Sequence, residues 1–200
     1  MQVIDNFVGK GYSSSLYAEM TSVHFPWFFF ESMVKLTDED KKHKESFALY
    51  SPVFRHNFVN QTQINSKIQV LNPLIEKIQR LFNRDIMIYN IHANLLLTNS
   101  EMTGKYSLPH VDVSYDADTY NESDCYTGIY YLNTTDSFTR VYNETAKIGN
   151  STLPDVFTKY CDIATEEDKF VYWDTNVYHS GPASTNKPRI LINVNFVVRK

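Results

Sequence analysis

The spacing of hydrophobic residues changes near residue 84, from a helical period to the two-residue period of strands. Before that point, residues 13–22 predict a short amphipathic helix, and residues 64–82 predict the longest helix of the chain, with a kink expected at Asn72-Pro73. The apolar positions of the longer helix are Ile64, Ile68, Leu71, Ile75, Ile78 and Phe82. The first part of the chain is therefore predicted to be mostly helical.

After residue 84, segments rich in β-branched and aromatic residues predict strands at 86–97, 109–115, 126–133, 138–142, 169–173 and 189–198. The last of these segments alternates Ile190, Ile192, Val194 and Phe196 with Arg189, Leu191, Asn193 and Asn195. An arginine and two asparagines are costly to bury unless they line a wet cavity or bind a charged ligand. The many short strands favour a sandwich or barrel, and we expect this polar face to line the inside of a barrel.

Length and composition fit one domain with a substantial core, because the chain has 200 residues, of which 42% are hydrophobic and 14% aromatic. No repeat and no long linker divides it. We predict a single domain over 1–200, with a helical support region at 1–84 and a strand-rich core at 85–200.

The net charge is −4 and the basic residues are scattered, which argues against a nucleic-acid partner. No apolar stretch reaches membrane-spanning length, and the first residues lack the pattern of a signal peptide. Two cysteines, Cys125 and Cys161, are too few for a disulfide framework. These features predict a soluble, intracellular protein with reduced thiols and no membrane partner; they do not predict an oligomeric state.

Two histidines and one aspartate form a candidate metal site. His110 and Asp112 alternate on a predicted strand, so both side chains can reach one ion, and His179 lies far downstream. Taken separately, each has an explanation other than metal binding. The His110 and Asp112 pair could be a hydrogen-bonded strand end, and His179 could be a surface residue in a turn. Taken together, two imidazoles and one carboxylate can bind Fe(II) on one face and leave positions open for a co-substrate and O2.

Arg189 and a tyrosine pair add a candidate carboxylate site. The planar guanidinium of Arg189 suits bidentate capture of a carboxylate, and the alternative is a surface salt bridge. The adjacent Tyr130 and Tyr131 must face opposite sides of a strand, so one hydroxyl can point inward.

In order and spacing, these motifs resemble the 2-oxoglutarate- and Fe(II)-dependent oxygenases, and within them the prolyl hydroxylases of collagen and hypoxia-factor type. The resemblance spans residues 86–200 and rests on His110-Val111-Asp112, 128–133, 162–173, His179 and 189–194. It implies a mainly β protein, a double-stranded β-helix of jelly-roll or cupin-like type with N-terminal helices packed on its major sheet. It also implies that His110, Asp112 and His179 bind iron, and that Arg189 and the Tyr131 hydroxyl bind the distal carboxylate of 2-oxoglutarate.

The resemblance further implies a catalytic group of His110, Asp112, His179 and Arg189, with Fe(II), 2-oxoglutarate, O2 and ascorbate as cofactors. Hydroxylation of a C–H bond would be accompanied by formation of succinate and CO2. The contact to the keto-acid end of 2-oxoglutarate stays open between Asn94 and Tyr89.

Acidic residues near the predicted mouth of the site favour a neutral or basic peptide over a phosphate backbone: Asp116, Asp118, Glu122 and Asp124. The resemblance to prolyl hydroxylases then implies a peptide or protein substrate hydroxylated at a prolyl residue. Tyr115, Trp173 and Asn195 are the candidate substrate-binding residues. One alternative is an oxygenase acting on a free amino acid, another small molecule or a nucleobase. The other is a non-catalytic jelly-roll binding module. His56 and His92 lie in apolar surroundings and are expected to be core or pocket-wall histidines, with support of the site as an alternative role for His92; replacing either should leave iron binding intact.

Overall fold

The computed structural model describes residues 1–32, 42, 47–48, 52–99, 105–112, 124–146 and 153–199. Its helices are α1 (Lys10–Thr21), a 3₁₀ helix (Ser66–Leu71) and α2 (Asn72–Phe82). Its strands are β1 (Gln2–Ile4), β2 (Phe28–Phe30), β3 (Phe47–Ala48), β4 (Val53–Asn60), β5 (Gln63–Ile64), β6 (Ile86–Leu96), β7 (Tyr106–Ser107), β8 (Cys125–Tyr131), β9 (Phe138–Thr145), β10 (Lys159–Ala164), β11 (Lys169–Asp174), β12 (Val177–Ser180) and β13 (Arg189–Val198).

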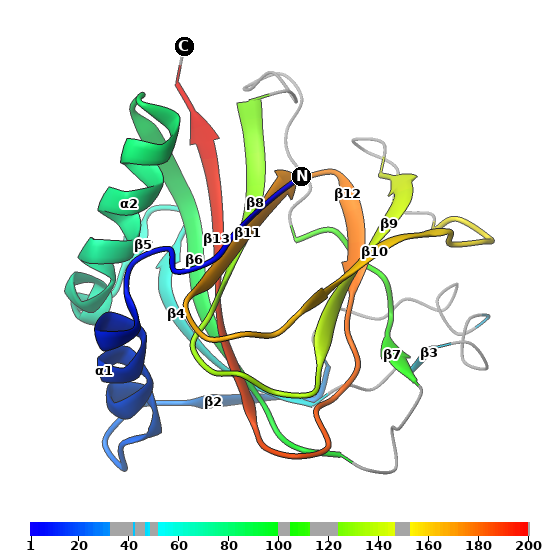
Figure 1. The fold of residues 1–200 in the computed structure, drawn as a ribbon, viewed down its shortest axis with the longest axis horizontal. Coiled ribbons are helices and arrows are strands. Elements are labelled where there is room, and N and C mark those ends of the chain that lie inside the picture. Colours follow the sequence, from blue (N-terminus) through cyan, green and yellow to red (C-terminus); the bar gives the residue numbers. More distant parts are fainter. Residues whose placement is uncertain are drawn as a thin grey trace.

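The strands form two facing sheets and one small parallel pair. The eight-stranded sheet has the order β1-β11-β8-β13-β6-β4-β2, with β5 added beside β4. The three-stranded sheet has the order β10-β9-β12, and β3 pairs with β7. Figure 1 shows α1 and α2 on one side of the large sheet and β9, β10 and β12 on the other. This arrangement confirms the expected jelly-roll architecture with helices on the major sheet.

Two hydrophobic clusters lie on opposite faces of the large sheet, because alternate residues of each strand point to opposite sides. On the helix side, Ile190, Ile192, Val194 and Phe196 of β13 pack with Leu16 of α1 and with Leu74 and Ile78 of α2. Between the sheets, Leu191 packs with Tyr131, Trp173 and Val141. The polar residues of β13 therefore face the space between the sheets.

The barrel expected from the polar face of β13 is not formed, since this face looks across to a separate three-stranded sheet. The helical character expected for 1–84 is also only partly correct, because β4 lies in this region and pairs along its length with β6. The pattern also missed β10 and β12. In addition, the described part of the expected strand at 109–115 contains only an isolated bridge at His110.

The helix expected at 64–82 is divided at the proline. Residues Ser66–Leu71 form the 3₁₀ helix, and Pro73 occupies the first turn of α2. A proline is tolerated there because the first N–H groups of a helix have no partner within the helix. The Asn72-Pro73 pair thus begins α2 instead of kinking a continuous helix.

Asp168 fastens the N-terminal segment to the large sheet. Its buried carboxylate accepts hydrogen bonds from the backbone N–H of Val8 (2.9 Å) and Gly9 (2.9 Å) and from the Tyr130 hydroxyl (2.7 Å). These bonds hold the start of α1 against the helix-side core.

Among the described residues, no helix combines the length and apolar character needed to cross a bilayer. Cys125 and Cys161 are not joined in a disulfide.

Gly128 of β8 is required by close packing against β11. A Cβ atom added there would lie 2.7 Å from Phe170 Cζ. We expect Gly128→Ala to lower the free energy of unfolding by about 1–3 kcal/mol, because overpacking displaces the fully buried Phe170 ring. Urea denaturation measures this change. Gly11→Ala is the control, because Gly11 is exposed in α1 with no atom within 4 Å of the added Cβ and should be neutral or stabilising. Equal effects of the two substitutions would contradict the packing argument.

Candidate metal and 2-oxoglutarate site

Backbone pairing brings the two predicted histidine ligands together. The His110 N–H donates to the His179 carbonyl (3.0 Å), and the His179 N–H donates to the His110 carbonyl (2.9 Å). His179 lies on β12 opposite Val141 of β9. The two imidazole rings are 4.5 Å apart between centroids. An isolated bridge between segments far apart in sequence thus builds one side of the site.

Asp112 completes a cluster with the geometry of a metal site. Its Oδ1 lies 3.3 Å from His179 Nε2 and 3.6 Å from His110 Nε2. One ligand atom from each of the three residues falls within 4.8 Å of the others. Neighbouring ligands of an octahedral ion lie about 3 Å apart when metal–ligand bonds are about 2.1 Å. The ligand atoms, which lie between 3.3 Å and 4.8 Å apart, would move closer together to hold a divalent ion by two nitrogens and one oxygen, the donor set that suits non-haem Fe(II).

The charge state of the cluster also suits a metal. Burial alone would raise the pKa of Asp112, but His179 and His110 outweigh it, so the pKa lies below its usual range. Burial, followed by the charge of His179, lowers the pKa of His110 to about 4. At neutral pH the carboxylate is ionised and the His110 imidazole keeps a lone pair for a metal.

We expect the metal-free protein to lose about 2–4 kcal/mol of its free energy of unfolding between pH 7 and pH 5. Burial lowers the pKa of His92 to about 3 and that of His110 to about 4, from 6.5. Below pH 6.5 these two histidines bind protons in the unfolded chain but not in the folded chain. The free energy of unfolding therefore decreases as the pH is lowered. Denaturant titrations in a chelator at both pH values measure the loss. His92→Ala should remove roughly half of the pH dependence, and stability independent of pH over this range would contradict neutral buried histidines.

Arg189 is a buried cation, with 3% of its surface exposed. Its Nη2 donates to Thr139 Oγ1 (2.7 Å), which also accepts from the Tyr131 hydroxyl (2.7 Å). Its Nε is buried without a hydrogen-bond partner, and within the described residues no carboxylate lies at ion-pair distance from it. Lys169, by contrast, is paired with Glu166 (3.0 Å). A buried charge without a counter-charge is costly unless a ligand supplies the anion.

Arg189 and the metal cluster are linked through the three-stranded sheet, because Arg189 contacts Thr139 of β9 and His179 pairs with the same strand. Thr139 is two residues from Val141, the cross-strand partner of His179, which corresponds to about 7 Å along a strand. A metal-bound five-carbon dicarboxylate is long enough to reach across such a gap. Gly181 leaves room for the guanidinium, since a Cβ atom there would lie 3.0 Å from Arg189 Nη1.

Tyr131 points into the space between the two sheets and Tyr130 points into the core on the helix side, as expected for adjacent strand residues. Burial raises the pKa of Tyr131, and the positive charge of Arg189 partly offsets this effect. The Tyr131 hydroxyl is therefore neutral, and it donates its hydrogen to Thr139 Oγ1 beside the guanidinium.

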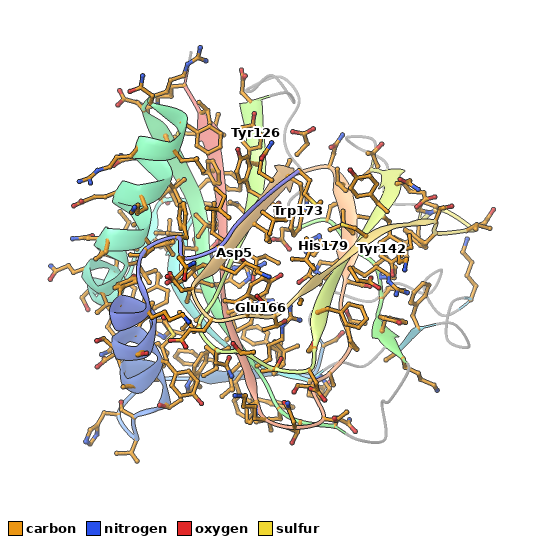
Figure 2. The ribbon with its side chains drawn as sticks, viewed as in Figure 1. Asp5, Tyr126, Tyr142, Glu166, Trp173 and His179 are labelled. Atoms are coloured by element: carbon orange, nitrogen blue, oxygen red, sulfur yellow. The ribbon has the colours of Figure 1, made fainter. Side chains whose placement is uncertain are left out.

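Two of the three candidate substrate-binding residues, Trp173 and Asn195, belong to the described residues. Trp173 packs edge-on against His179 with ring centroids 5.1 Å apart, and Figure 2 shows both between the two sheets. Asn195 is fully buried, and its Oδ1 accepts from Thr127 Oγ1 (3.0 Å). Tyr115 lies outside the described residues, as do Asp116, Asp118 and Glu122. The substrate-binding roles of all three candidates stay predictions.

Two residues of the site were missed by the sequence analysis. Thr139 joins Arg189 to Tyr131, and Asn193 donates to Asp112 Oδ2 (3.0 Å). The alternation of β13 already placed Asn193 on the same face as Arg189, which was a usable signal. Nothing in the sequence singles out Thr139. Asn94, a candidate for the keto-acid contact, is hydrogen-bonded to Asn193 and Arg55, and its role toward the keto acid stays a prediction.

Comparison with solved structures identifies the fold. The epimerase SnoN from nogalamycin biosynthesis, described as a non-heme, alpha-ketoglutarate-dependent enzyme, aligns with a TM-score of 0.64 and 10% identity over 98% of this chain and 77% of its own. A prolyl hydroxylase from Trichoplax adhaerens, in complex with a hypoxia-inducible-factor peptide fragment, aligns with a TM-score of 0.56 and 14% identity over 98% and 83%. The viral collagen prolyl hydroxylase of Paramecium bursaria Chlorella virus-1 aligns with a TM-score of 0.55 and 12% identity over 99% and 96%.

The chain has the fold of the 2-oxoglutarate- and Fe(II)-dependent oxygenases. No protein-family model matches the sequence, and no curated protein matches it. The motif resemblance is therefore confirmed at the level of the fold, and in this oxygenase fold His110, Asp112 and His179 meet between the two sheets.

Proposed function

We propose that this chain is a 2-oxoglutarate- and Fe(II)-dependent oxygenase that hydroxylates an unactivated C–H bond. The observation that carries the proposal is the convergence of His110, Asp112 and His179 in a space that also contains the buried, unpaired cation Arg189. A metal site alone has many uses. A metal site combined with an anion site at the reach of a dicarboxylate matches the needs of 2-oxoglutarate chemistry.

Each residue has a distinct role in this proposal. The Nε2 atoms of His110 and His179 and the Oδ1 atom of Asp112 would hold Fe(II), and three protein ligands would leave coordination positions for the co-substrate and O2. Arg189 and the Tyr131 hydroxyl bind the distal carboxylate of 2-oxoglutarate and fix its direction. The two sheets exclude water from the reacting centre. Bound iron and 2-oxoglutarate together supply oxidative decarboxylation, which uses O2 to give succinate and CO2 and delivers one oxygen atom to the substrate.

A prolyl residue of a peptide or protein is the proposed substrate. Similarity of the fold to prolyl hydroxylases, one of them in complex with a peptide, supports this choice. A second candidate is a small molecule. It is favoured by the similarity to SnoN, which was also solved with Fe3+, alpha-ketoglutarate and nogalamycin RO.

An anaerobic titration of the Fe(II)-loaded protein with 2-oxoglutarate tests the proposal. We expect a weak visible charge-transfer band that saturates with 2-oxoglutarate, because a chelated keto acid produces one. Succinate, which lacks the keto group, is the matched control ligand and should give no band. Folded, iron-containing protein without the band would contradict the proposal and favour a non-catalytic binding module.

Succinate formation then separates the substrate classes. Proline-containing peptides, free proline, other small molecules and an oligonucleotide are compared at equal concentration. A rise above the uncoupled background with peptides alone supports the prolyl assignment. A rise with small molecules alone supports the second candidate and excludes the first.

A further inference from the structure

A chain of three hydrogen bonds runs across the large sheet to the candidate metal ligand Asp112. Arg55 Nε donates to Asn94 Oδ1 (2.9 Å), Asn94 Nδ2 donates to Asn193 Oδ1 (3.1 Å), and Asn193 Nδ2 donates to Asp112 Oδ2 (3.0 Å). Arg55 of β4 lies directly opposite Asn94 of β6, and the next strand, β13, carries Asn193. We call Arg55, Asn94 and Asn193 the Arg55 relay.

The direction of the Arg55 relay is fixed at both ends. A guanidinium can only donate hydrogen bonds, and an ionised carboxylate can only accept them. Each asparagine can do either, depending on which way its amide is turned. Because Arg55 donates to Asn94 Oδ1, the Asn94 NH₂ must face Asn193, and the Asn193 NH₂ must then face Asp112. Asn94 and Asn193 are 1% and 4% exposed, so water is not a ready substitute partner for either amide.

Arg55 is a half-buried cation without a counter-charge among the described residues. No carboxylate of the described residues lies at ion-pair distance from it, and its guanidinium lies over the Phe30 ring at 5.4 Å. Phe30 belongs to the edge strand β2, which pairs with β4. The side chain is thus held between an aromatic face and Asn94, with its Nε aimed along the relay.

We propose that Arg55, Asn94 and Asn193 are positioning residues that keep Asp112 bound to the metal through one oxygen only. This inference rests on the proposed function, because it requires a metal at His110, Asp112 and His179. The two Asp112 oxygens have different neighbours: Oδ1 faces His110 and His179, whereas Oδ2 is occupied by the Asn193 NH₂. A carboxylate that binds through both oxygens takes one more coordination position. The Asn193 hydrogen bond therefore keeps open a position that the co-substrate needs.

Four variants of the full chain test the Arg55 relay. Asn193→Leu removes the donor to Asp112, and Arg55→Met removes the group that orients both amides without touching Asp112. Arg55→Lys keeps a cationic donor and should restore part of the effect. Tyr130→Phe is the matched control, because it removes one buried hydrogen bond, to Asp168, on the helix side of the sheet. Two quantities are measured: Mn(II) affinity by electron paramagnetic resonance, and 2-oxoglutarate affinity at saturating Mn(II) by calorimetry.

For Asn193→Leu we expect Mn(II) affinity to fall about 10- to 100-fold, the usual effect of losing a partner of a metal ligand. We expect 2-oxoglutarate affinity to fall as well, even at saturating Mn(II), since a freed Asp112 competes for its coordination position. Arg55→Met should show the same pattern to a smaller degree, and Arg55→Lys should lie between it and the unaltered chain.

Two other outcomes would overturn the inference for different reasons. If the unaltered chain binds Mn(II) and 2-oxoglutarate, but Asn193→Leu and Arg55→Met match Tyr130→Phe, the relay has no positioning role and the proposed function stands. If the unaltered chain binds no Mn(II), the proposed function fails and the relay inference fails with it.

Discussion

Replacement of His179 with alanine is expected to lower Fe(II) affinity by more than about 100-fold, beyond the range for residues that only support a ligand. His179 supplies one of the three atoms of the cluster, and its Nε2 is closer to Asp112 Oδ1 (3.3 Å) than His110 Nε2 is (3.6 Å). Its side chain is largely shielded from solvent. The void left by alanine offers at most a water molecule in place of the imidazole. Anaerobic equilibrium dialysis against Fe(II), followed by iron analysis, measures the loss.

His92→Ala is the matched control for this prediction. His92 is buried on β6 directly opposite Asn193, so it lies close to the site, but it is not part of the metal-ligating cluster within the described residues. We expect His92→Ala to keep bound iron and the charge-transfer band with 2-oxoglutarate. Loss of iron in His92→Ala, together with its retention in His179→Ala, would overturn the ligand assignment.

Several residues of the candidate site could be chosen from the sequence because part of their signal is local. His110 and Asp112 are two positions apart, and the alternation of β13 placed Arg189, Asn193 and Asn195 on one face. Adjacent tyrosines at 130 and 131 had to face opposite sides. The inferences for β8 and β13 needed only the geometry of a single strand, whereas His110 and Asp112 meet without the strand expected at 109–115.

What the sequence did not reveal depends on pairing between distant segments. β4 lies in the part expected to be helical, yet it pairs with β6 and brings Arg55 next to Asn94. His110 and His179 meet through a bridge that joins the motif to β12, which the hydrophobic pattern missed. Such contacts depend on which strands become neighbours, and hydrophobic periodicity contains no information on that choice.

In the proposed function, the requirement for a cation at Arg189 opposes stability. The guanidinium is 3% exposed, makes its hydrogen bond to the neutral Thr139, and has no carboxylate partner within the described residues. Burial lowers its pKa, which is the sign of an unfavourable environment for the charge. Natural folds rarely keep such a group for stability alone, since apolar replacements of buried charges are often neutral or stabilising by about 1–4 kcal/mol.

We therefore expect Arg189→Met to separate binding from stability. Loss of the buried cation should weaken 2-oxoglutarate binding by about 2–5 kcal/mol, or roughly 30-fold to several thousand-fold, because the distal carboxylate would be desolvated without a partner. Fe(II) affinity should stay within a few-fold of the unaltered chain, since Arg189 is not part of the metal cluster. The free energy of unfolding of the ligand-free protein should be unchanged or higher. Calorimetric titration with 2-oxoglutarate and urea denaturation of the same samples give the two quantities.

Arg140→Met is the matched control, because Arg140 is the neighbour of Thr139 on β9 and has a carboxylate partner. Its Nε and Nη2 each donate to Asp162 at 2.7 Å, so its charge is already compensated. This variant should keep 2-oxoglutarate affinity and should lose, at most, about 1 kcal/mol of stability, as expected for a partly exposed ion pair. The two arginines are thus expected to respond in opposite directions. If Arg189→Met binds 2-oxoglutarate normally and is strongly destabilised, Arg189 is a structural residue and the co-substrate site must lie elsewhere.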